Sequence, residues 1–203
     1  VPSSSVCEIK SLGSMKILVG IPTYNEEIAI GSIVSEAQQY ADEVVVVDDG
    51  STDNTVQIAR HLGATVIEHE MNKGKGGALR TLMGYAAEVD DIDSLVVLDG
   101  DGQHLPEDIP DVVDPVLAGE CDISIGSRYV EETETETPVH RRFGQRVLDY
   151  LTMGSSGENL SDTQSGFRAL SPAAISQLNL RTDGMGVESE MISEATDRDL
   201  EID

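Results

Sequence analysis

Residues 43–51 read EVVVVDDGS, an unbroken apolar run that ends in two aspartates, a glycine and a serine. A strand with one solvated face alternates apolar and polar residues, whereas four consecutive valines favour a strand covered on both faces, as in a parallel sheet. The polar residues that follow mark a loop at the carboxyl end of the strand. This stretch therefore predicts a buried parallel strand that leads into a polar loop.

The same unit of apolar strand, polar loop and helix repeats along the chain. Strands are predicted at Lys16–Ile21, Glu43–Val47, Ala64–Glu68, Ser94–Leu98 and Cys121–Ile125. Helices, with apolar residues at three- and four-residue spacing, are predicted at Glu26–Tyr40, Thr52–Leu62, Gly76–Ala87 and Pro106–Leu117. This alternation is typical of an open, mostly parallel α/β sheet with right-handed crossovers and helices on both faces.

The last third of the chain departs from this alternation. Glu131–Thr137 is charged and has no apolar anchor, so we expect a mobile loop near residues 130–140. Ser161–Leu170 predicts a turn that leads into a short extended segment. Further helices are predicted at Val139–Met153, Pro172–Leu178 and Val187–Asp197.

The domain organisation expected from these patterns is simple. Residues 15–203 should form one domain, a length that suits a single core. Residues 1–14 are polar, small and aperiodic, so we interpret them as a leader or remnant outside the fold. The final residues start another apolar segment, and we expect the native chain to continue past Asp203.

The composition is strongly acidic. Asp and Glu number 38 against 13 Lys and Arg, which gives a formal net charge of −25 in 203 residues. Self-repulsion on this scale strains a compact state unless salt screens it, so we expect a halophilic source. We expect no nucleic-acid partner.

Two further absences in the sequence bear on where the protein works. Cys7 and Cys121 lie far apart in different contexts, which indicates neither a disulfide framework nor a zinc site. No apolar run approaches the roughly 18–20 residues needed to cross a bilayer. These features favour a cytoplasmic protein.

Polar residues gather where the predicted strands end. Four such clusters follow strands, at residues 22–26, 48–51, 99–101 and 126–128. Ligands of open α/β sheets bind beyond the carboxyl ends of the strands. We therefore expect the functional site at this edge of the sheet.

The segment Asp99-Gly-Asp101-Gly-Gln103 is the strongest candidate for a cation site. It is not an EF-hand loop, because His104 and Pro110 stand where that loop requires Gly and Glu. Two carboxylates at a strand end, with glycines that allow close backbone approach, suit Mg²⁺ or Mn²⁺ bridged to a diphosphate. The alternative is a solvated acidic turn.

Nearly half of the scarce positive charge lies in two segments. Six of the 13 cationic side chains are Lys73, Lys75, Arg128, Arg141, Arg142 and Arg146. The lysines belong to NKGKGG (72–77), which opens a predicted helix, where backbone N–H groups favour an anion. This segment is neither a P-loop nor a complete Gly-x-Gly-x-x-Gly, since Leu79 replaces the third glycine. Solvated lysines, and arginines paired with the Glu131–Thr137 loop, remain the alternatives.

Seven segments, in this order, resemble the family 2 glycosyltransferases of GT-A fold. They are PTYNEE (22–27), VVVDDGSTDNT (45–55), NKGKGGALRT (72–81), VVLDGDGQHLPEDI (96–109), GSRY (126–129), HRR (140–142) and DTQSGFRAL (162–170). The resemblance covers about residues 16–200 and is greatest to the branch that makes dolichyl- or polyprenyl-phosphate sugars. It implies a GT-A catalytic domain with a Rossmann-like sheet.

The resemblance also implies an activity and a set of site residues. The activity is an inverting, metal-dependent transfer of a hexose from a nucleotide sugar to a lipid phosphate at the inner face of the cell membrane. The resemblance assigns donor binding to Pro22, Tyr24, Glu26, Asp49, Lys75, Asp99 and Gly100. It assigns Mg²⁺ or Mn²⁺ binding to Asp99, Asp101 and Gln103. It assigns a catalytic role to Asp101, and to Arg128, Arg141 and Arg142, which would bind the acceptor phosphate. Ser165 and Arg168 would shape the sugar–acceptor end.

Two details refine the expected substrates. A phosphate monoester is already anionic near neutral pH, so it needs no general base. Glu188 and Glu190 are the nearest candidates for a base, but no Glu-Asp or Gln-Asp pair occurs there, which favours a phosphate acceptor. The DGDGQH segment resembles that of transferases that use UDP-sugars more than that of the mannose synthases, which implies UDP-glucose or another UDP-hexose over GDP-mannose as donor.

Three alternatives remain open at this point. They are a GDP-mannose-dependent transferase, a sugar-phosphate nucleotidyltransferase, and a receiver-like or nucleotide-sensing module with Asp48 and Asp49 as its acidic pocket. The oligomeric state is not predicted.

Overall fold

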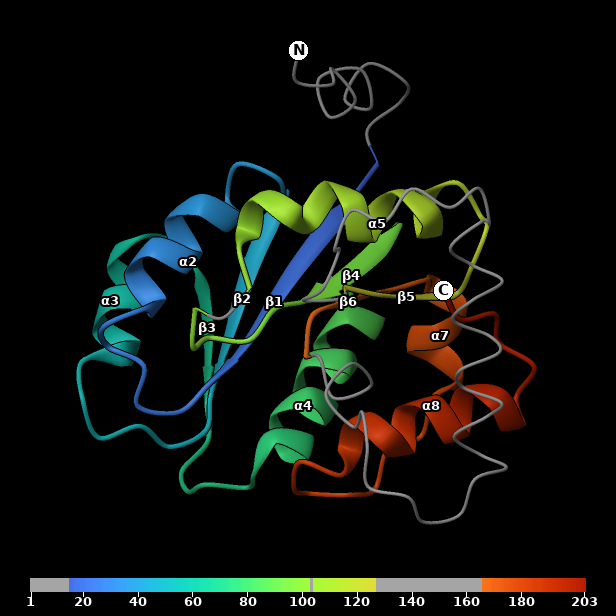
Figure 1. The fold of residues 1–203 in the computed structure, drawn as a ribbon. Coiled ribbons are helices and arrows are strands. Elements are labelled where there is room, and N and C mark those ends of the chain that lie inside the picture. Colours follow the sequence, from blue (N-terminus) through green and yellow to red (C-terminus); the bar gives the residue numbers. More distant parts are fainter. Residues whose placement is uncertain (1–14, 103, 127–165) are drawn as a thin grey trace, which may run out of the picture.

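A computed structural model describes residues 15–102, 104–126 and 166–203 of the chain (Figure 1). The predictions for residues 1–14, for the Glu131–Thr137 loop and for a helix at Val139–Met153 lie outside these described residues. Each statement below refers to the described part.

A single sheet runs through the described residues. Its six strands are β1 (Ile17–Thr23), β2 (Glu43–Asp48), β3 (Thr65–Glu68), β4 (Ser94–Val97), β5 (Ile123–Ile125) and β6 (Arg168–Leu170), in the order β3-β2-β1-β4-β6-β5. The first four strands pair in parallel, and β6 pairs antiparallel with both β4 and β5. The predicted mostly parallel α/β sheet is confirmed, and all five predicted strands are present.

Helices cover both faces of this sheet. They are α2 (Ile30–Ala37), α3 (Thr55–His61), α4 (Lys75–Ala87), η1 (Pro106–Asp108), α5 (Ile109–Leu117), α7 (Pro172–Gln177) and α8 (Val187–Asp197). One face packs against α2, α3 and α5, and the other against α4, α7 and α8 (Figure 1).

Strand β2 shows why four consecutive valines suit this position. Val45 and Val47 belong to the cluster under α4, α7 and α8, whereas Val44 and Val46 belong to the cluster under α2, α3 and α5. All four side chains are buried, and burial of an aliphatic side chain contributes roughly 1.5–3 kcal/mol. Each face of the strand therefore stabilises a different helical layer.

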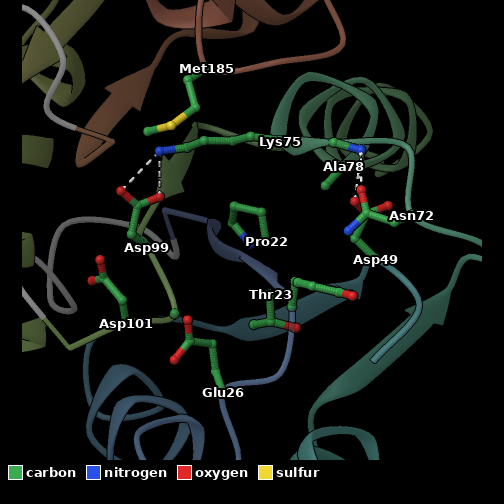
Figure 2. Close-up of a pocket in the computed structure, with 13 residues that line it drawn as sticks. Pro22, Thr23, Glu26, Asp49, Asn72, Lys75, Ala78, Asp99, Asp101 and Met185 are labelled. Atoms are coloured by element: carbon green, nitrogen blue, oxygen red, sulfur yellow. Dashed lines mark hydrogen bonds and ion pairs between the residues drawn. The ribbon is translucent and has the colours of Figure 1, made fainter. Parts of the chain in front are cut away.

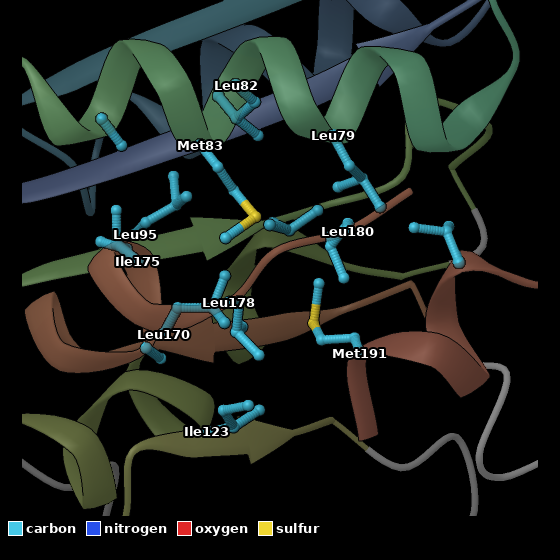
Figure 3. Close-up of a cluster of buried hydrophobic side chains, with 14 of the residues drawn as sticks. Leu79, Leu82, Met83, Leu95, Ile123, Leu170, Ile175, Leu178, Leu180 and Met191 are labelled. Atoms are coloured by element: carbon cyan, nitrogen blue, oxygen red, sulfur yellow. The ribbon is translucent and has the colours of Figure 1, made fainter. Parts of the chain in front are cut away.

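The layer of α4, α7 and α8 brings distant parts of the chain together (Figure 3). Leu79, Leu82 and Met83 of α4 pack in one cluster with Ile175 of α7 and Met191 of α8. This packing fixes the start of α8 beside the start of α4, which matters for the site described below.

The loops at the carboxyl edge shorten two predicted helices. The helix expected at Glu26–Tyr40 begins at Ile30, because the N–H groups of Glu26 and Glu27 bond the side chains of Thr55 and Asp53. The loops after β1 and β2 are thereby tied to each other across the edge of the sheet.

The helix expected at Thr52–Leu62 begins at Thr55, with Asn54 as its N-cap residue. The Asp53 carboxylate accepts hydrogen bonds from both the N–H and the hydroxyl of Thr55, at 3.0 and 2.5 Å. A second tie joins the same loops, because Asn54 donates to the carboxylate of Glu27.

Candidate functional site

A pocket of about 370 Å³ lies at the carboxyl edge of the parallel strands, as expected from the topology (Figure 2). Its lining comes from the end of β1, from the loops after β1, β2, β3 and β4, from the start of α4 and from the segment before α8. The lining residues are Pro22, Thr23, Tyr24, Glu26, Asp49, Asn72, Gly74, Lys75, Ala78, Asp99, Gly100, Asp101 and Met185.

Most of the site residues expected from the sequence meet in this pocket. Eight of them line it: Pro22, Tyr24, Glu26, Asp49, Lys75, Asp99, Gly100 and Asp101. Five other expected residues lie outside the described residues, namely Gln103, Arg128, Arg141, Arg142 and Ser165, and Arg168 lies on β6. The sequence pattern thus identified residues from four separate loops that share one pocket.

Asp49 forms one end of the pocket and is fully engaged by the protein. Its Oδ1 accepts a hydrogen bond from Lys73 N at 2.8 Å and lies 2.7 Å from Nδ1 of His69, and its Oδ2 accepts from Gly74 N at 2.8 Å. Because an ionised carboxylate can only accept, Nδ1 of His69 is the donor in that contact. The Asp49 carboxylate therefore sets the shape of the loop that leads into α4.

His69 is a buried residue that the sequence did not single out. Its Nε2 lies 2.8 Å from the hydroxyl of Thr81 on α4, so the imidazole bridges this helix and Asp49. Gly74, with φ +79°, completes the turn, and a Cβ there would meet the carbonyl of Asp183 at 2.3 Å. No local pattern marks His69, because its two partners lie 20 and 12 residues away.

Lys75 and Asp99 form the opposite end of the pocket (Figure 2). The Lys75 ammonium lies 2.9 Å from Oδ1 and 3.0 Å from Oδ2 of Asp99, and 2.5 Å from Oε1 of Glu188 at the start of α8. Burial alone would lower the pKa of Lys75, but the charge of Asp99 and the hydrogen bonds to Glu188 and Asp99 outweigh it and hold this pKa above its ordinary value. Lys75 therefore keeps its positive charge.

Arg168 supplies a second cation behind this pair. The resemblance placed it at the sugar–acceptor end, and the structure places it on β6 with 2% of its surface exposed. Burial lowers the pKa of its guanidinium, and the charges of Glu188 and Asp99 oppose that effect. Two negative side chains, Asp99 and Glu188, thus lie close to two positive ones, Lys75 and Arg168.

Asp101 and Glu26 add negative charge in front of this network. Burial, followed by the charges of Asp101, Asp53 and Asp99, raises the pKa of Glu26 above its ordinary value. Asp101 is exposed to solvent, whereas Asp99 and Glu26 are half-buried. Within the described residues, Glu26, Asp99 and Asp101 thus gather negative charge at this mouth of the pocket, which suits a bound divalent cation.

Two glycines allow the backbone to come close to these acids. A Cβ at Gly100 would meet Thr23 Cγ2 at 2.8 Å, and a Cβ at Gly166 would meet the Asp99 carboxylate at 2.0 Å. Gly166 lies in the SGFR segment and was not predicted as a site residue. A glycine inside a recognised motif is the signal that could have identified it.

The acids alone would bind a divalent cation weakly, and a bound ligand would strengthen that binding. Among the described residues, no group of three or more His, Cys, Asp or Glu side chains could hold a metal ion. Asp99 and Asp101 are hard oxygen donors on one loop, and a Mg²⁺ or Mn²⁺ ion commonly takes its remaining ligands from water and a diphosphate. The residues present therefore fit a metal that arrives with a phosphorylated ligand.

A receiver-type phosphorylation site does not fit the described geometry. Asp48 is 2% exposed and its Oδ2 accepts hydrogen bonds from the N–H groups of Gly50 and Ser51. Asp49 is 3% exposed and holds three partners, as described above. Both carboxylates are used to shape loops.

Known proteins resemble the chain over most of its length. Residues 18–178 match the family described as Glycosyl transferase family 2. The UDP-N-acetylglucosamine–dolichyl-phosphate N-acetylglucosaminyltransferase of Methanococcus voltae is 35% identical over 178 residues, with 78% of this chain and 70% of that protein covered. The dolichyl-phosphate hexose transferase of Haloferax volcanii is 33% identical over 179 residues, with 87% and 75% covered.

A solved structure shares the fold. Glucosyl-3-phosphoglycerate synthase from Mycobacterium tuberculosis, in complex with Mn²⁺, UDP and glucosyl-3-phosphoglycerate, superposes with a TM-score of 0.72 at 26% identity and covers 100% of this chain and 74% of that one. The chain spans between 45% and 77% of the length of its curated relatives.

None of the helices in the described ranges has the length and apolar character needed to cross a membrane. The predicted GT-A architecture is confirmed by the sheet and by the solved relative. Because the family match extends over most of its length, the chain is a glycosyltransferase and belongs to family 2 of these enzymes.

Proposed function

We propose that the chain transfers a hexose from a nucleotide sugar, with a UDP-hexose favoured over GDP-mannose, to dolichyl or polyprenyl phosphate. The single observation that carries this proposal is the pocket in which Asp99 and Asp101 face Lys75 at the carboxyl edge of the sheet. The names of the M. voltae and H. volcanii relatives, which act on dolichyl phosphate, support the acceptor. The UDP in the solved relative supports the donor class.

The nucleoside would lie between the loops after β1 and β2. Pro22 and Tyr24 offer apolar surface there, with Tyr24 48% exposed, and Glu26 and Asp49 offer carboxylates to the ribose or base. Since the oxygens of Asp49 already hold the 72–74 loop, its main contribution is to fix the floor of this end. An aromatic face and a rigid floor suit a planar base.

The diphosphate would lie toward Lys75, Asp99 and Gly100. A divalent cation held by Asp99, Asp101 and Gln103 would stabilise the negative charge of the departing diphosphate. Lys75 would add a hydrogen bond and a positive charge on the same group. The absence of a side chain at Gly100 lets the backbone approach the ligand.

The acceptor phosphate would attack the anomeric carbon from the opposite side, which inverts its configuration. A phosphate monoester carries its own negative charge near pH 7, so no proton needs to be removed first. We assign Arg128, Arg141 and Arg142 to this phosphate, with the loop near residues 130–140 closing over it. We place the enzyme peripherally at the inner face of the cell membrane, where it would meet a lipid acceptor, and residues 15–203 would act as one catalytic domain.

Product analysis tests this proposal. The protein is incubated in high salt with Mn²⁺, a panel of nucleotide sugars, and dolichyl phosphate or no acceptor. We expect a nucleoside diphosphate and a lipid-linked hexose to form together, and only with the lipid phosphate present. Release of pyrophosphate from a nucleoside triphosphate and a sugar phosphate, with no lipid product, would instead identify a nucleotidyltransferase.

A further inference from the structure

The pocket contains a cation of its own at the position assigned to the metal. The Lys75 ammonium contacts both oxygens of Asp99, at 2.9 and 3.0 Å (Figure 2). A divalent cation that binds Asp99 must therefore displace this ammonium or share the carboxylate with it. In the donor-free pocket, the Asp99 carboxylate is therefore already paired with the Lys75 ammonium.

Glu188 is the second partner of that ammonium and is an unusual residue to bury. It is 1% exposed, and its Oε1 lies 2.5 Å from the Lys75 ammonium. Its Oε2 is buried and accepts no hydrogen bond from any residue that the structure describes. A buried acceptor without a donor costs roughly 1–3 kcal/mol, and an apolar residue of similar size would avoid this cost. Packing of α8 alone therefore does not require a glutamate here, although the charge of Glu188 also favours the charged form of the buried Arg168.

Glu188 and Asp99 lie on different elements, and Lys75 bridges them. Asp99 follows β4, Glu188 begins α8, and Lys75 is the first residue of α4. A long, flexible side chain can leave one carboxylate while it keeps the other. With Glu188 in place, Lys75 can leave Asp99 without becoming an unpaired charge in a half-buried site.

We propose that Lys75 is an exchangeable internal cation of Asp99, and that Glu188 is the positioning residue that retains it during the exchange. When the donor enters with its divalent cation, the Lys75 ammonium moves from the Asp99 carboxylate to the diphosphate and stays hydrogen-bonded to Glu188. This inference rests on the proposed function for the identity of the donor. The exchange between ammonium and divalent cation is independent of that function.

The exchange makes distinct predictions for the two side chains. Lys75→Met removes the competing cation, so Mn²⁺ should bind the nucleotide-free protein about tenfold more tightly than it binds the wild type. Lys75→Arg keeps the charge and should leave Mn²⁺ binding weak. Glu188→Gln should weaken Mn²⁺ binding about tenfold, because displaced Lys75 then has no negatively charged partner.

A double-mutant cycle distinguishes retention of Lys75 from a simple loss of negative charge. If Glu188 acts through Lys75, Glu188→Gln should change Mn²⁺ affinity by less than about threefold in the Lys75→Met background. Glu188→Asp is a second probe, because it keeps the charge but is one methylene shorter. It should also weaken Mn²⁺ binding if contact with Lys75 is what matters.

The experiment is a titration of Mn²⁺ followed by electron paramagnetic resonance, with no nucleotide, at one fixed salt concentration, on wild type and these five variants. Circular dichroism checks that each variant is folded. The outcome that supports the proposal is tighter binding in Lys75→Met together with non-additivity in the cycle. Equal Mn²⁺ affinity in wild type and Lys75→Met, or an equal effect of Glu188→Gln in both backgrounds, would overturn it. Because no donor or acceptor is present, the result does not depend on whether the proposed transfer occurs.

Discussion

At one end of the pocket, the Asp49 carboxylate accepts hydrogen bonds from two backbone N–H groups and contacts His69. At the other end, the Asp99 carboxylate contacts the flexible side chain of Lys75, and Asp101 is exposed. Both ends are acidic strand termini of one sheet. Their partners differ in kind. Asp49 is held by backbone N–H groups and the buried His69 ring, whereas Asp99 contacts the Lys75 side chain, which can move.

This difference separates acidic residues that hold the shape of the site from acidic residues that bind a ligand there. A carboxylate whose oxygens are held by backbone donors lowers the energy of one loop conformation, and its loss should appear in stability. A carboxylate that faces a movable cation can exchange that partner for a ligand, and its loss should appear in binding and turnover. Substitutions at the two ends test whether the distinction holds.

The largest effect is expected for Asp101→Asn. This change removes a negative charge from the exposed end of the pocket and should lower turnover of nucleotide sugar and lipid phosphate about 100-fold or more. The melting temperature should hardly change, because the side chain is exposed. Glu107→Gln, an exposed acid in the same loop, is the matched control and should keep its activity. Equal turnover in both variants would remove Asp101 from the site.

Next in size is the effect of Asp49→Ala on folding. The change leaves two backbone N–H groups and His69 without their acceptor, so the free energy of unfolding should fall by about 3 kcal/mol. Urea denaturation measures it. Glu70→Ala removes a neighbouring exposed acid and should stay within about 0.5 kcal/mol of wild type. If the two variants were equally stable, Asp49 would not shape the loop.

A smaller effect is expected where α4 meets the segment before α8. A Cβ at Gly76 would lie 1.8 Å from the carbonyl of Thr182, so Gly76→Ala should lower the free energy of unfolding by about 1–3 kcal/mol and displace this wall of the pocket. Gly84, later in the same helix, has open space and should gain about 0.5–1 kcal/mol as alanine. Thermal unfolding of the pair provides the comparison, and a stabilised Gly76→Ala would contradict the close contact.

The sequence predicted those features of the architecture that depend on residues close together in the chain. The valines of residues 44–47 predicted a strand buried on both faces, and they pack against both helical layers. The polar segments after the strands predicted the pocket edge, because parallel strands carry their carboxyl ends to one side. Halophily and oligomeric state stay untested.

The remainder depends on contacts between residues far apart in the chain. Strand β6 has three residues and lies between β4 and β5, and nothing within Arg168–Leu170 specifies those neighbours. Lys75 and Glu188 are 113 residues apart, so the bridge between them has no local pattern. The Asp49 carboxylate looks like a ligand site in the sequence, and only the fold shows that His69 and the 73–74 backbone already hold it.

One measurement tests the contrast between the two ends most directly. Calorimetry gives the affinity of UDP for wild type, Asp101→Asn and Asp49→Ala, each with Mn²⁺ and with EDTA. We predict that Mn²⁺ strengthens UDP binding at least about tenfold in wild type, that Asp101→Asn loses this gain, and that Asp49→Ala keeps it even if its absolute affinity falls. The same gain from Mn²⁺ in all three proteins, or no gain in wild type, would contradict the assignment of the Asp99–Asp101 end to the metal and diphosphate.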